Sequence, residues 1–103
     1  MNSQTLYARY QQLRNWVGWD ESDARLLREA GDVLRPRLPE LVDDFYAEIE
    51  RQPEARRVIT GGAAQVVRLK QTLAIWLEEF FAANFDEQYV QKRWQVGWRH
   101  VEI

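Results

Sequence analysis

The sequence predicts an all-α fold of helices joined by short loops. Apolar residues recur every three or four positions along the whole chain, which is the spacing of one face of a helix. No stretch alternates apolar and polar residues with a period of two, as a half-buried strand would. The chain has 103 residues and no linker long enough to divide it, so residues 1–103 are expected to form a single domain.

The N-terminal part of the chain carries the signals of two helices. Residues 1–19 contain a short apolar stripe and are expected to form a first helix. A second helix follows, because Asp20 or Ser22 can cap it by accepting hydrogen bonds from its first N–H groups. Pro36 and Pro39 then interrupt it, since proline lacks an N–H group and clashes with the preceding turn.

Three further helices are expected in the rest of the chain. The helix over residues 63–83 carries the broadest apolar stripe, so it is expected to be the most buried. Thr60-Gly61-Gly62 predicts the loop before that helix, and Asn84-Phe85-Asp86 predicts the corner after it, with Asp86 as the cap of the last helix. The three helices are expected over residues 38–51, 63–83 and 87–103.

Composition excludes several classes of function. With 14 basic and 16 acidic side chains the net charge is −2, so a nucleic-acid partner is not expected. The absence of Cys excludes a thiolate metal site and a disulfide framework, and fits a cytoplasmic location. The longest apolar run, Leu73–Leu77, is far shorter than the ~20 residues of a membrane helix, so no membrane partner is expected either.

His100 is the single histidine of the chain. A lone helical His is more often a surface or hydrogen-bonded residue than a ligand, but one neutral imidazole is enough to hold haem iron. Gly97 lies one turn before it on the same helix face. A glycine inside a helix costs about 0.5–1 kcal/mol relative to alanine, so it needs a reason. Close packing of another helix and close approach of a flat macrocycle explain it equally well.

Tyr46, Leu69 and Thr72, which lie earlier in the chain, are candidates for the opposite side of such a site. Tyr46 lies on an apolar helix face, where it is either a core residue bonded to a backbone carbonyl or a donor to a polar diatomic ligand. Leu69 and Thr72 are neighbours one turn apart. The Thr72 hydroxyl either bonds back to its own helix or adds a second donor, and Leu69 either belongs to the core or controls access.

Three segments together resemble the globin-coupled sensors and protoglobins. Tyr89-Val-Gln-Lys-Arg-Trp-Gln-Val-Gly-Trp-Arg-His-Val-Glu-Ile103 resembles the proximal helix of that family, with Tyr, Arg, an aliphatic-Gly pair and then His. Leu41-Val-Asp-Asp-Phe-Tyr-Ala-Glu-Ile49 is similar to its B helix, and Arg68-Leu-Lys-Gln-Thr-Leu73 to its distal E helix. The resemblance implies globin helices over residues 20–103, preceded by an extra N-terminal helix in residues 1–19.

The resemblance also implies a cofactor and a role for each candidate residue. The cofactor is haem b, with His100 as the proximal iron ligand and Gly97 beside it. Tyr46 is the distal hydrogen-bond donor, Thr72 an auxiliary distal group and Leu69 an apolar wall. The implied function is sensing of dioxygen, NO or CO in a signal-transduction protein, without an enzymatic activity of this domain. Tyr89 and Arg93 match recurring positions, but they receive no role.

The sequence ends three residues after His100, whereas the family continues with two long helices. The resemblance therefore implies an incomplete globin-like fold that lacks the last two helices, and exposed apolar surface that favours a homo-oligomer. Two other functions remain open. One is a globin-like helical interaction or dimerisation module without haem. The other is a haem redox enzyme, a peroxidase or a nitric oxide dioxygenase, against which the absence of a second His counts.

Overall fold

The expected helices are present in the computed structural model, which describes residues 2–103. The helical elements, in chain order, are α1 (Ser3–Val17), α2 (Glu21–Leu34), the 3₁₀ turn η1 (Arg35–Arg37), α3 (Leu38–Arg51), the short α4 (Pro53–Arg56), α5 (Gly62–Ala82) and α6 (Glu87–Glu102). No strand occurs among these described residues. The all-α prediction is confirmed, and the predicted helix boundaries agree with the observed ones to within a few residues.

Aspartate side chains set where α2 and α6 begin. Asp20 caps α2 in a reciprocal capping box with Asp23, and the carboxylate of Asp86 accepts a hydrogen bond of 2.8 Å from the backbone N–H of Tyr89 to start α6. Both satisfy N–H groups that have no partner inside the helix. Gly18 ends α1. It adopts a φ of 78°, a left-handed conformation in which a residue without Cβ is favoured.

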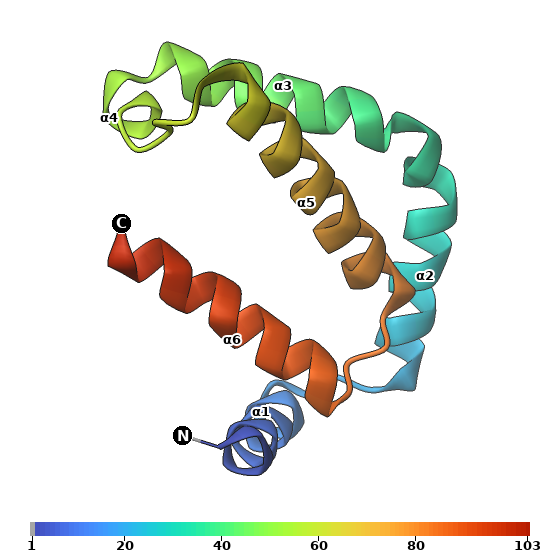
Figure 1. The fold of residues 1–103 in the computed structure, drawn as a ribbon. Helices are drawn as coiled ribbons and strands as arrows, with labels where there is room; N and C mark the ends of the chain where they lie inside the picture. Colours follow the sequence, from blue (N-terminus) through green and yellow to red (C-terminus); the bar gives the residue numbers. More distant parts are fainter. Residues whose placement is uncertain (1) are drawn as a thin grey trace.

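The helices pack as two groups that meet at the corner between α5 and α6. In one group α1 packs against α6, and in the other α2 and α3 pack against α5. Figure 1 shows α3 and α2 lining one side of α5, while α6 begins at the corner beside α1, which is seen end-on, and its C-terminal half extends away from α1. The chain therefore places α5 and α6 as two arms that are joined at residues 83–86.

The core is thin for a chain of this length. The buried hydrophobic residues are Ala24, Leu38, Val42, Tyr46, Ala83 and Val90. The molecule measures 40 × 35 × 19 Å and has a radius of gyration of 15.9 Å, against about 13 Å for an average globular domain of 100 residues. The helix expected over residues 63–83 to be the most buried is only half covered: about half of the α5 residues are half-buried, more than in the other helices, but within that range only Ala83, just after the end of α5, is fully buried. The apolar stripe of α5 is covered on one side only.

Candidate functional site

The Tyr46 side chain joins α3 to α5. It is one of the few buried side chains, and its hydroxyl donates to the backbone carbonyl of Leu69 over 3.5 Å. That distance lies beyond the usual O–H···O range of about 2.5–3.0 Å, so the hydroxyl is held weakly. Burial raises the pKa of Tyr46, which keeps the hydroxyl protonated as a donor. The structure thus brings two of the predicted residues, Tyr46 and Leu69, together.

Thr72 lies one turn after Leu69 on α5 and does not join Tyr46. Its hydroxyl donates to the carbonyl of Arg68 in its own helix over 3.0 Å, and the residue is exposed. This is the ordinary arrangement of a helical threonine. Leu69 is half-buried, and its backbone carbonyl, rather than its side chain, makes the contact with the Tyr46 hydroxyl.

His100 lies near the end of α6, and its ring is oriented by the helix itself. Its Nδ1 is 2.8 Å from the carbonyl oxygen of Val96. A carbonyl only accepts, so Nδ1 carries the proton in this contact and the neutral ring presents an unprotonated Nε2. The residue is exposed. An imidazole fixed in this tautomer by a backbone carbonyl is prepared to bind a metal through its other nitrogen.

Gly97 has open space in front of it. A Cβ atom built on this residue meets no heavy atom within 4 Å. Close packing of another helix would fill that space, so this explanation of Gly97 does not hold for the described chain. The free space lies one turn before His100 on the same helix, where a flat group bound to the imidazole would approach the backbone.

A contact without a predicted role connects the two arms. The Arg93 guanidinium of α6 lies between two aromatic rings, with its Cζ 4.0 Å from the ring centroid of Trp76 and 4.5 Å from that of Tyr89. One Nη donates to the backbone carbonyl of Trp76 over 2.8 Å. We call this cluster of Trp76, Arg93 and Tyr89 the Arg93 stack. The sequence pointed to Tyr89 and Arg93, because they match recurring positions of the family. It gave no sign of Trp76, which lies 17 residues before Arg93.

A comparison with protein-family models matches residues 6–103 to the protoglobin family. The chain belongs to the protoglobin family. Protoglobins are globin-type haem-binding domains of the sensor kind rather than enzymes, and their fold agrees with the helices described above. The predicted family and the globin-like fold class are thereby confirmed.

The side chains of this protoglobin suit a haem better than a metal ion held by several ligands. Among residues 2–103 no three His, Cys, Asp or Glu side chains gather where they could hold a metal ion. The imidazole of His100 would supply one nitrogen ligand to a haem iron, and the open space at Gly97 would leave room for the macrocycle beside it. The chemistry of these residues is compatible with the haem that the family binds.

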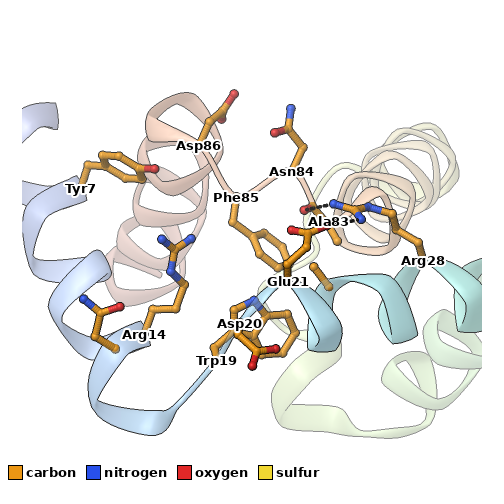
Figure 2. Close-up of a pocket in the computed structure, with 12 residues that line it drawn as sticks. Tyr7, Arg14, Trp19, Asp20, Glu21, Arg28, Ala83, Asn84, Phe85 and Asp86 are labelled. Carbon is orange, nitrogen blue, oxygen red and sulfur yellow. Dashed lines mark hydrogen bonds and ion pairs between the residues drawn. The ribbon is translucent and has the colours of Figure 1, made fainter.

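A hollow of about 360 Å³ lies elsewhere, between α1, α2 and the α5–α6 corner (Figure 2). It contains none of the predicted site residues. Its charged groups are largely engaged, since Asp20 and Asp86 cap helices and Arg28 pairs with Glu21 at 2.8 Å. This polar hollow does not suit an apolar macrocycle.

Within the described residues, no helix combines the length and hydropathy of a membrane span.

Proposed function

We propose that this protoglobin is a haem-based sensor domain for dioxygen, NO or CO, with His100 as the proximal ligand of haem b. The observation that carries the proposal is the 2.8 Å contact between His100 Nδ1 and the Val96 carbonyl, which leaves Nε2 free for iron. A bound haem would supply the iron that binds a diatomic gas, and His100 would hold that iron. The free space at Gly97 lets the porphyrin lie close to α6.

On the distal side, Tyr46 is proposed as the hydrogen-bond donor. Its hydroxyl has only a 3.5 Å contact to give up, and its raised pKa keeps the proton on the oxygen. Leu69 provides the apolar wall that excludes water and so strengthens the hydrogen bond. Thr72 becomes an auxiliary donor only if its hydroxyl leaves the Arg68 carbonyl, where it is bonded at 3.0 Å.

The signal is proposed to begin at the contact between α3 and α5. If the Tyr46 hydroxyl donated to a bound gas it would give up its 3.5 Å contact with the Leu69 carbonyl, and this link between α3 and α5 would be lost in the ligand-bound state. A ligand that makes such a differential contact shifts the equilibrium between helix arrangements. We propose further that an output module of a signal-transduction protein receives this shift. A cytoplasmic location belongs to the same proposal.

A haem titration tests the assignment. The chain should develop a saturable Soret band on addition of haem, and the band should shift when the reduced complex is exposed to CO. His100→Ala should abolish the spectral signature of histidine ligation. Arg99→Ala is the matched control, because Arg99 is exposed on the same helix and its ion pair with Glu102 is long at 3.9 Å.

Two outcomes would reject the proposal. Spectra of His100→Ala identical to those of the unaltered chain would show that another residue or no residue holds the iron. The absence of saturable haem binding would favour an interaction module instead, whose exposed surface includes the Trp94–Trp98 pair on α6, with ring centroids 6.4 Å apart. Turnover with peroxide at a haem that His100 does ligate would indicate a redox enzyme.

A further inference from the structure

The Arg93 stack holds a cation without an anionic partner. Arg93 forms no ion pair with any carboxylate in the part of the chain that the structure describes. Its Nε is buried and has no hydrogen-bond partner there. The guanidinium is therefore held by two aromatic faces and one carbonyl rather than by a salt bridge. Cation–π contacts of this kind are strongest where water is excluded.

The rings that enclose Arg93 are themselves held by other rings. Trp76 stacks on Phe80 along α5, with ring centroids 5.9 Å apart, and Tyr89 packs edge-on against Phe85 of the corner at 4.8 Å. Each neighbour restricts the ring that touches the guanidinium. The stack is consequently a stiff junction between α5 and α6 rather than a flexible surface contact.

The position of the stack relates it to the proposed site. Leu69 lies seven residues before Trp76 on α5, and His100 lies seven residues after Arg93 on α6. At 1.5 Å per residue, both are about 10.5 Å from the stack along their helices. A change of about 10° in the angle between the helices at the stack therefore alters the distance between the two sides of the site by about 2 Å.

We infer that Arg93 is a positioning residue whose stacked guanidinium sets the separation of α5 and α6 at the haem site. This inference rests on the proposed function for its ligand, but the junction itself exists without haem. Lysine cannot replace arginine here, because an ammonium group lacks the planar face and the fork of donors. Another link between the two helices is the ion pair of Lys92 with Glu79 at 3.6 Å, in which Lys92 is exposed.

The test measures the distance between the arms in the haem-free chain. The sequence has no cysteine, so spin labels can be attached at Arg68→Cys on α5 and Arg99→Cys on α6, both exposed. Arg93→Met keeps much of the side-chain volume and removes charge and stacking. It should broaden the distance distribution and shift its mean by about 2 Å or more, as follows from the lever length. Arg93→Lys should give part of that change, and Lys92→Met should give none.

The same variants are then titrated with haem. Arg93→Met should weaken haem binding by roughly tenfold or more, as expected for the loss of two cation–π contacts and a charged hydrogen bond, and Lys92→Met should not. If Arg93→Met lost its helical circular dichroism, Arg93→Lys would decide. Unchanged distance distributions in a folded Arg93 variant would overturn the inference. A chain that binds no haem yet widens in Arg93→Met would reject only the proposed function.

Discussion

Gly97→Ala should change the stability of the haem-free chain and its affinity for haem in opposite directions. The new Cβ meets no heavy atom within 4 Å, so the haem-free protein gains only the difference in helix propensity, about 0.5–1 kcal/mol. For a domain of this size that corresponds to a rise in Tm of roughly 2–8 °C. The methyl group occupies the space that we assign to the porphyrin. Overpacking there costs about 1–3 kcal/mol, which is roughly 5- to 150-fold in haem affinity.

Denaturant unfolding of the haem-free chain and haem titration by absorbance measure the two effects. Gly31→Ala is the matched control, because its Cβ would lie 2.6 Å from the Cβ of Phe81 across the α2–α5 contact. It should destabilise the chain by up to about 2 kcal/mol, the overpacking cost less the propensity gain. A haem-free Gly97→Ala protein less stable than the unaltered one would mean that Gly97 is packed. A more stable variant with unchanged haem affinity would remove the porphyrin from this face.

Three further outcomes follow from the hydrogen bonds and the pKa directions. Tyr46→Phe should release dioxygen roughly 10- to 150-fold faster, if the lost hydrogen bond to a partly charged ligand is worth about 1.5–3 kcal/mol, with a smaller effect on CO, as stopped-flow exchange would show. Burial raises the pKa of Tyr46 and of Tyr10, so their share of the stability is complete below pH ~10 and is lost as the pH rises through the folded-state pKa; replacing both by Phe should flatten the alkaline limb of the denaturation midpoint. Hydrogen bonds from Ser22 and from the backbone N–H of Asp23 lower the pKa of Asp20, so its cap stabilises α2 above pH ~3.9 and is lost as the pH falls through the lower folded-state pKa. In Ser22→Ala the acid-induced loss of helix, followed by circular dichroism, should occur at a higher pH than in the unaltered chain; an unshifted acid transition would contradict this.

The local parts of the fold could be predicted because they depend on neighbours in the chain. Helical periodicity identified the helices, and Asp20 and Asp86 begin α2 and α6 as expected. Burial of a whole helix could not be predicted in the same way. A broad apolar stripe predicts that α5 seeks cover, but whether cover exists depends on how α6 leaves the corner, and α6 packs against α1 instead.

The candidate site, too, could be predicted from the sequence only in part. Which residues are available, a single His, a glycine one turn before it and a tyrosine on an apolar face, is a property of the sequence alone. Helix spacing placed Gly97 beside His100, and the resemblance to protoglobins suggested their roles. The choice between the two explanations of Gly97 required the surroundings of its Cβ, which are open.

The sequence by itself determined the all-α class, the family and the list of candidate ligands, because these depend on residue types and on spacings within one helix. The tertiary structure decided that Tyr46 reaches Leu69, whereas the ring nitrogen of His100 that faces a carbonyl is set within α6 itself. The tertiary structure also revealed Trp76 as the partner of Arg93. Residues 17 positions apart meet there only because the corner folds α6 back from α5, and no periodicity within a single helix encodes the angle of that corner.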